Sequence, residues 1–204
     1  MLSKFGRPIL NQPLATIARP LHRWGITPNG ISIVGFLLTV AASALLAIGE
    51  LRWGGVLLLI AASFDMLDGA LARHTNQVSK FGAFLDSTLD RYSESITLLG
   101  LTIFYASHSQ NQLHLVLIFL ALIGSWMVSY TRARAEGLQI ECKGGLLQRP
   151  ERIAILIAGL ILGWMLPVLW VLAVLTNFTA LQRIRAVYAQ TLSTNPSQAT
   201  IDIE

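Results

Sequence analysis

The sequence predicts an all-α integral membrane protein with six transmembrane helices and an N-terminal interfacial amphipathic helix. Hydrophobic residues make up 53% of the 204 residues, charged residues only 13%, and the mean hydropathy is +0.58. A soluble domain carries about 25% charged residues, whereas a membrane-spanning helix needs roughly 20 apolar ones. Long apolar runs alternate with short basic patches. This pattern excludes a soluble enzyme, a disordered chain and a secreted scaffold built on disulfides, and the single cysteine, Cys142, cannot form an internal disulfide.

Three regions follow from the order of these patterns. Residues 1–26 mix basic residues and prolines with apolar residues at roughly helical spacing, which is typical of a segment that lies on the membrane surface. This segment lacks the continuous apolar core of a cleavable signal peptide. Residues 27–188 are expected to form one six-span domain. Residues 189–204 are rich in Ser, Thr, Asn and Gln, and we expect a disordered tail.

Helix signals and apolar runs place the six spans. Thr27 is a capping hydroxyl and Pro28 suits the first position of a helix, so a helix is expected to start there. The expected spans cover residues 29–48, 53–73, 83–107, 113–136, 152–166 and 167–188. With this arrangement, 14 of the 15 Lys and Arg residues fall on the side of the two termini, and only Arg52 falls on the other. Because basic residues collect in cytoplasmic loops, both termini are predicted to be cytoplasmic, in a multi-pass protein of the cell (plasma) membrane.

Four aspartates lie inside the predicted second and third spans. Asp65 and Asp68 are three residues apart, and Asp86 and Asp90 are four apart, so each pair shares one helix face. The connection between the two spans, residues 74–81, is short enough to make them antiparallel neighbours. We therefore expect the four carboxylates to face one another near the cytoplasmic end. Charged groups within a span are costly and usually functional.

Such a carboxylate cluster points to divalent cations. Hard ions with oxygen ligands, such as Mg²⁺, Mn²⁺ or Ca²⁺, would neutralise it best. Two such ions suit a substrate diphosphate, whose oxygens would complete their coordination. Gly69 and Ala72 leave the helix surface beside the acids bare, so a flat group could approach the backbone there. Two other interpretations are an ion-conduction path and a structural ion network with nearby arginines, namely Arg73, Arg91, Arg132 or Arg134.

The stretch from residue 65 to residue 90 resembles a known signature. It reads D-M-L-D-G-A-L-A-R, eight further residues, and then G-A-F-L-D-S-T-L-D. It is similar at every fixed position to D-x-x-D-G-x-x-A-R-x8-G-x3-D-x3-D, the signature of the CDP-alcohol phosphotransferases. The resemblance implies an N-terminal interfacial helix, six spans and a homodimer. The Thr27-Pro28-Asn29 opening of the first span is also similar to that of the family.

The resemblance implies a reaction and a role for each residue of the signature. A CDP-activated lipid, CDP-diacylglycerol, donates its lipid phosphate to an alcohol, and CMP leaves. Two ions, Mg²⁺ or Mn²⁺, bind the four aspartates, and Asp90 also acts as the general base. The CDP-lipid site is assigned to Asn29, Asp68, Gly69, Ala72, Arg73 and Gly82.

The basic residues after the signature indicate the acceptor. The segment 130–136, Y-T-R-A-R-A-E, and the later pair Glu151-Arg152 resemble the branch of the family that makes phosphatidylinositol phosphate. The acceptor phosphate is assigned to Arg132, Arg134, Arg152 and Arg183. Arg185 is an alternative to Arg183, and arginines also collect at cytoplasmic helix ends for topological reasons. The expected partners are CDP-diacylglycerol, a phosphorylated polyol and membrane lipids, and no nucleic acid.

Several alternatives remain at this point. The same chemistry could use glycerol 3-phosphate, free inositol or serine as acceptor. An aromatic prenyltransferase also places Asp-rich motifs and Mg²⁺ against a diphosphate, although its motifs lie farther apart. A cation transporter is the non-enzyme alternative, and it would release no CMP.

Overall fold

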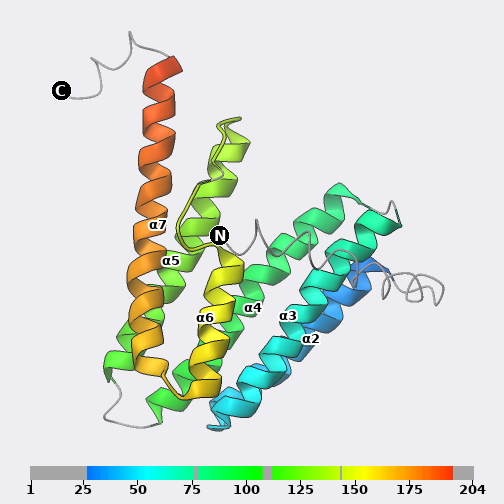
Figure 1. Cartoon of the computed structure of the whole chain (residues 1–204), viewed down its shortest axis with the longest axis vertical. Helices are drawn as coiled ribbons and strands as arrows, with labels where there is room; N and C mark the ends of the chain where they lie inside the picture. The colour runs from blue at the N-terminus through cyan, green and yellow to red at the C-terminus, as the bar shows by residue number, and fades with distance from the viewer. Residues whose placement is uncertain (1–26, 76–77, 108–111, 143, 195–204) are drawn as a thin grey trace.

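The computed structural model describes residues 27–75, 78–107, 112–142 and 144–194. These residues form α-helices and connections without a strand, which confirms the predicted all-α class (Figure 1). The helices are α2 (Pro28–Ala47), α3 (Leu51–His74), α4 (Lys80–Ala106), α5 (Gln112–Gly137), α6 (Arg149–Leu162) and α7 (Met165–Thr194). The predicted interfacial segment, residues 1–26, lies outside the described residues.

Local capping determines where the helices start. The Thr27 hydroxyl accepts a hydrogen bond from the Gly30 amide at 3.2 Å, and Pro28 follows as the first helical residue, as predicted. Ser79 caps α4 in the same way, with a 2.9 Å bond from the Gly82 amide.

The boundary between the last two helices differs from the prediction. The sequence predicts a fifth span that ends at residue 166 and a sixth that begins at Pro167. In the structure α6 ends at Leu162, because Gly163 adopts a left-handed conformation with φ of 75°. Helix α7 then begins at Met165 and includes Pro167 in its first turn, where a proline removes no intrahelical hydrogen bond. It continues to Thr194 and so includes residues 189–194 of the expected tail.

Four of the described helices are long and apolar enough to cross a membrane. They are Pro28–Ala47, Leu51–Arg73, Gln112–Gly137 and Met165–Leu192. Helix α4 is long enough, but its first half carries Asp86, Asp90, Arg91 and Glu94. Helix α6 has 14 residues, which is about 21 Å of helix, against a hydrocarbon core of about 30 Å. The count of six spans therefore stays a prediction.

The packing of α3 and α4 differs from the expectation that they are packed neighbours. Within the described residues, α2 packs against both α3 and α4, α6 packs against α3 and α7, and α5 packs against α4 and α7. Helices α3 and α4 have no comparable direct interface. Small residues allow α2 to approach α4 closely: a Cβ atom on Gly100 would lie 2.5 Å from the Ser43 carbonyl oxygen. The two aspartate pairs therefore lie on helices that are separated rather than packed.

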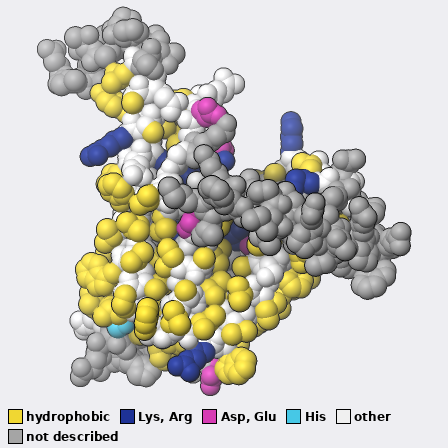
Figure 2. Space-filling model, in the orientation of Figure 1, with side chains coloured by type: hydrophobic (Ala, Val, Ile, Leu, Met, Phe, Trp, Pro, Cys, Tyr) yellow, Lys and Arg dark blue, Asp and Glu magenta, His cyan; other side chains and the backbone are white. Residues whose placement is uncertain are grey.

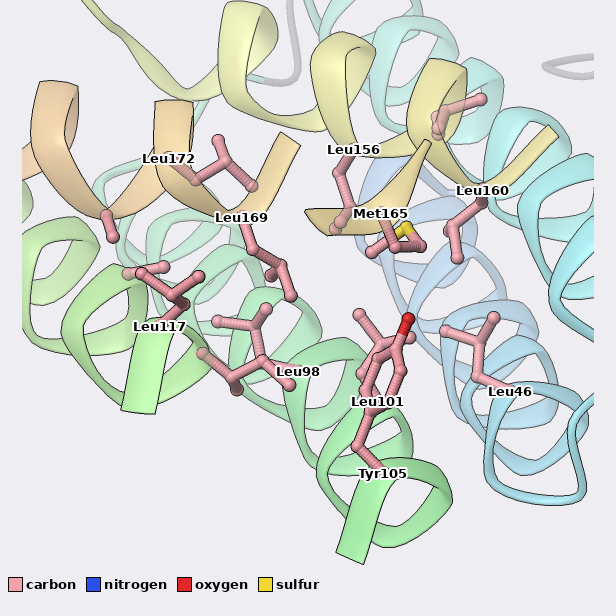
Figure 3. Close-up of a cluster of buried hydrophobic side chains, with 14 of the residues drawn as sticks. Leu46, Leu98, Leu101, Tyr105, Leu117, Leu156, Leu160, Met165, Leu169 and Leu172 are labelled. Atoms are coloured by element: carbon pink, nitrogen blue, oxygen red, sulfur yellow. The ribbon is translucent and has the colours of Figure 1, made fainter. Parts of the chain in front are cut away.

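The hydrophobic core joins these helices around the second half of α4. Leu98 and Leu101 lie at its centre, and Leu101 is fully buried (Figure 3). Around them, each of the other helices contributes leucines, among them Leu46, Leu58, Leu117, Leu156, Leu160, Leu169 and Leu172. The core thus fixes the helices far from the aspartates, which lie toward the opposite ends of α3 and α4.

Candidate active site

The two aspartate pairs come from α3 and α4. Asp68 is buried, and its carboxylate accepts a 2.5 Å hydrogen bond from the Ser32 hydroxyl of α2. Asp65 and Asp86 are both close enough to Asp68 to repel it electrostatically. Asp90 is likewise repelled by Asp65 and Asp86. The structure therefore brings all four predicted carboxylates into one electrostatically coupled group.

Arg149 lies between the two helices and bridges their carboxylates. Its Nη2 atom is 2.6 Å from Asp65 Oδ2, and its Nη1 atom is 2.7 Å from Asp90 Oδ1. The residue is the first of α6, and it reaches the site because α6 packs against α3. Part of the predicted ion network is therefore present. Arg91, one of the arginines considered from the sequence, lies 3.9 Å from Asp90, and Arg149, which was not among them, makes the two shorter contacts.

The donor set of this site fits a divalent cation. Within the described residues, no three acidic, histidine or cysteine side chains are grouped closely enough to hold a metal ion. Arg149 contacts both Asp65 and Asp90. The available ligands are carboxylate oxygens only, which hard cations prefer. The guanidinium group also shows that a positive charge is stabilised between the two helices.

The residues assigned to the CDP-lipid surround the ends of α2, α3 and α4. A Cβ atom on Gly82 would lie 3.2 Å from the Asn29 side-chain oxygen, so these two residues are neighbours. A Cβ atom on Gly69 would lie 3.3 Å from Arg73 Nη1, so the exposed Arg73 side chain lies over the glycine. Ala72 is half-buried on the same helix. The surface expected to receive a flat group is therefore bordered by the Arg73 guanidinium group.

Two of the arginines assigned to the acceptor are buried and already have partners. Arg152 forms a bidentate ion pair with Glu94 of α4, with distances of 2.7 and 2.8 Å. Arg183 of α7 donates to the backbone carbonyls of Gly144, at 2.8 Å, and Val128. Arg183 thereby connects α7 to α5 and to the loop before α6. Its two hydrogen-bond partners are neutral carbonyls, so its charge is not neutralised by them.

The other two lie at the end of α5 and are exposed. Arg132 pairs with Glu136 at 2.8 Å. Arg183 is close enough to Arg132 and to Arg152 to be repelled by both, and Glu136 is close enough to attract it. Arg134 lies two residues after Arg132, so it projects from a different side of the helix. Arg132 and Arg152 thus lie near Arg183, and the assignment of Arg134 to the acceptor stays a prediction.

Three residues of this site had no assigned role in the sequence analysis. Ser32 carried no signal, since serines in apolar helices usually mark close packing. Glu94 lies four residues after Asp90 and so extends the row of Asp86 and Asp90 along α4. Arg149 is 84 residues from Asp65 in the chain, and nothing in its local sequence indicates that contact.

Comparisons with known proteins match most of this chain to one family. The model of the CDP-alcohol phosphatidyltransferase family matches residues 25–192. An archaetidylinositol phosphate synthase of Pyrococcus horikoshii is 40% identical over 188 residues, covering 90% of this chain and 95% of the relative. A phosphatidylinositol phosphate synthase of Mycobacteroides abscessus is 40% identical over 180 residues, covering 84% of this chain and 81% of the relative.

Solved structures extend the match to three dimensions. The phosphatidylinositol phosphate synthase of Mycobacterium tuberculosis with CDP-DAG bound matches with a TM-score of 0.81 and 34% identity, covering 86% of this chain and 93% of that one. A structure of the same enzyme with manganese and citrate has the same TM-score and identity, and the match covers 86% of this chain and 88% of that one. On the sequence match, the signature of four aspartates and the shared fold, this chain is an enzyme of the CDP-alcohol phosphatidyltransferase family.

Proposed function

We propose that this enzyme transfers the lipid phosphate of CDP-diacylglycerol, or of a CDP-activated ether lipid, to the hydroxyl of inositol phosphate and releases CMP. The acceptor is supported by the basic residues around the buried Arg183 of α7, because Arg132 of α5 and Arg152 of α6 both lie close enough to repel it. The relatives named above share inositol phosphate in their names and differ in the lipid, archaetidyl in one and phosphatidyl in the other.

Electrostatics favour a phosphorylated acceptor over a neutral one. Arg132 and Arg152 form ion pairs with Glu136 and Glu94. Within the part of the chain that the structure describes, Arg183 donates to two backbone carbonyls, and Glu136 is its nearby carboxylate. Arg132 and Arg152 both repel the Arg183 guanidinium group. A phosphate monoester carries nearly two negative charges at neutral pH, so it would relieve this repulsion. A neutral polyol would not.

Two divalent ions, Mg²⁺ or Mn²⁺, are proposed to bind Asp65, Asp68, Asp86 and Asp90. This is supported by the all-carboxylate donor set and by the manganese in the structure of the M. tuberculosis relative. When bound, such ions neutralise the diphosphate and make CMP a better leaving group. Ser32 fixes the orientation of the Asp68 carboxylate through its 2.5 Å hydrogen bond. Asn29, Gly69, Ala72, Arg73 and Gly82 are proposed to surround the CDP portion.

Asp90 is proposed as the general base. Its carboxylate takes the proton of the acceptor hydroxyl, the hydroxyl oxygen forms a bond to the lipid-side phosphorus, and the bond from that phosphorus to the bridging oxygen breaks, so that CMP leaves. Arg149 contacts Asp90 at 2.7 Å in this structure. An aspartate paired with an arginine is a weaker base, so this contact has to be released before proton transfer.

The charge distribution supports a cytoplasmic active site. Figure 2 shows hydrophobic side chains gathered over the lower part of the bundle, with most of the basic and acidic ones above them. Arg52 is exposed at the start of α3, at the opposite end of that helix from Asp65 and Asp68. By the positive-inside rule, the end with the aspartates is cytoplasmic, and so are both termini. The homodimer expected from the resemblance stays a prediction.

The direct test measures CMP. The purified full chain is incubated with CDP-diacylglycerol and Mn²⁺, with or without inositol phosphate, and CMP is quantified. We expect CMP release only when the acceptor is present, and none in excess EDTA until Mn²⁺ is restored. Release that persists in excess EDTA would contradict the proposed metal site, and no release with any acceptor would contradict phosphatidyl transfer.

A further inference from the structure

The contact between Arg149 and the carboxylates of Asp65 and Asp90 is not explained by the reaction. Those two carboxylates are proposed to hold cations, and Asp90 has to accept a proton, yet one guanidinium group binds both at 2.6 and 2.7 Å. Arg149 therefore lies where a cation between α3 and α4 would lie. Four carboxylates in a largely apolar setting need a positive charge nearby, because each isolated charge is costly there.

Arg149 is held less completely than the neighbouring Arg152. The Arg152 side chain is 3% exposed, and its three nitrogens contact Glu94 and the Leu147 carbonyl. The Arg149 side chain is 24% exposed, and its buried Nε atom has no hydrogen-bond partner among the described residues. A buried donor without a partner costs free energy. The hydrogen-bonding groups of Arg149 are thus less completely satisfied than those of Arg152.

The position of Arg149 in the fold also allows it to move. It is the first residue of α6 and follows the connection from residue 138 to residue 148. Arg152, one helical turn later, anchors α6 to α4 through Glu94. The Arg149 side chain can therefore leave the aspartates without displacing the helix.

We propose that Arg149 is the internal counter-cation of the metal-free site, and that its guanidinium group is exchanged for a divalent cation. This inference rests on the metal site of the proposed function. In the metal-free enzyme, Arg149 offsets the repulsion between Asp65 and Asp90 and links α3 to α4. A divalent cation at the same carboxylates would repel the guanidinium group, so Arg149 and the cation compete.

The test measures Mn²⁺ binding without any substrate. Free Mn²⁺ is quantified by electron paramagnetic resonance in the purified full chain, and the thermal unfolding midpoint is measured in EDTA and with Mn²⁺. In Arg149→Gln, the competitor is lost, so Mn²⁺ should bind at least about tenfold more tightly, the equivalent of one charged hydrogen bond. The unfolding midpoint in EDTA should fall, and the rise on adding Mn²⁺ should exceed that of the wild type.

Arg91→Gln is the matched control. Arg91 lies 3.9 Å from Asp90, is partly exposed and bridges no two carboxylates. Its removal deletes one nearby positive charge, so Mn²⁺ affinity should rise by about fivefold or less, as for an exposed ion pair.

Arg149→Lys covers the case in which Arg149→Gln does not fold. It keeps the charge but not the fork that joins two carboxylates, so the midpoint in EDTA should fall and that with Mn²⁺ should not.

The outcomes separate this inference from the proposed function. Mn²⁺ binding in the wild type, with an affinity in Arg149→Gln that is no higher than in Arg91→Gln, would overturn the counter-cation role alone. An unfolding midpoint of Arg149→Lys in EDTA equal to that of the wild type would also overturn it. An absence of Mn²⁺ binding in the wild type and in Arg149→Gln would overturn the metal site and this inference together.

Discussion

Arg152 and Glu94 form a buried bidentate ion pair that joins α6 to α4, with Nε 2.7 Å from Oε1 and Nη2 2.8 Å from Oε2. This pair lies one helical turn from Arg149, so it also positions the residue that bridges Asp65 and Asp90. It gives Arg152 a structural role beside the acceptor role assigned from the sequence.

Arg152→Gln is expected to destabilise the protein, because it leaves the Glu94 charge buried without its partner. Breaking a buried ion pair in this way costs about 3–5 kcal/mol, which chemical unfolding in detergent would measure. Replacing both residues, as E94M with R152M, should recover most of the loss, since apolar replacement of a buried pair is often neutral. Wild-type stability of Arg152→Gln, together with a raised KM for the acceptor, would show that Arg152 acts on the acceptor alone.

Asp90→Asn is expected to lower kcat by about 10²–10⁴-fold, the usual cost of losing a general base. Binding of CDP-diacylglycerol should suffer much less, because Asp65, Asp68 and Asp86 remain. Steady-state CMP release and equilibrium lipid binding measure the two effects. Glu50→Gln, an exposed change at the far end of the bundle, serves as the control and should keep wild-type turnover. If Asp90→Asn keeps more than about a tenth of wild-type kcat, the base is another residue.

Ser32→Ala is expected to weaken Mn²⁺ binding by about 10–100-fold, the usual cost of losing a group that orients a metal ligand. The Ser32 hydroxyl donates to Asp68 at 2.5 Å, and its loss frees that carboxylate to rotate. Ser63→Ala is the matched control, because among the described residues the Ser63 hydroxyl donates to the Leu59 carbonyl of its own helix and to no carboxylate. Equal Mn²⁺ affinity in both variants would show that the Ser32 contact does not position Asp68.

Arg132→Gln is expected to raise the KM for inositol phosphate roughly tenfold to a hundredfold, which is the usual effect of losing one hydrogen bond to a charged group. The KM for CDP-diacylglycerol should stay nearly unchanged. Arg134→Gln is the matched control: it removes an equal charge two residues away, from a side of α5 that does not face Arg183 and Arg152. A larger effect of Arg134→Gln than of Arg132→Gln would reverse this assignment of the acceptor site.

Local sequence was sufficient for the start of α2 and for the spacing of the aspartates, because caps and helical periodicity act over a few residues, but it misplaced the boundary between α6 and α7. The start of α2 at Pro28 and the shared faces of the two aspartate pairs were predicted on that basis. The contacts across the site were not predictable in this way. Arg149 meets Asp65 across 84 residues and Arg152 meets Glu94 across 58. These contacts arise from the packing of α2 between α3 and α4, and of α6 on α3.

The most direct test of the central claim is a competition between acceptors. The purified enzyme receives CDP-diacylglycerol, Mn²⁺ and equal concentrations of inositol phosphate, free inositol and glycerol 3-phosphate in one mixture, and mass spectrometry identifies the lipid products. Their early ratio gives the relative kcat/KM values for the three acceptors. This account predicts that phosphatidylinositol phosphate exceeds each of the other products at least about tenfold, the contribution of one charged contact. A predominance of phosphatidylglycerophosphate, or equal amounts of phosphatidylinositol and its phosphate, would contradict it.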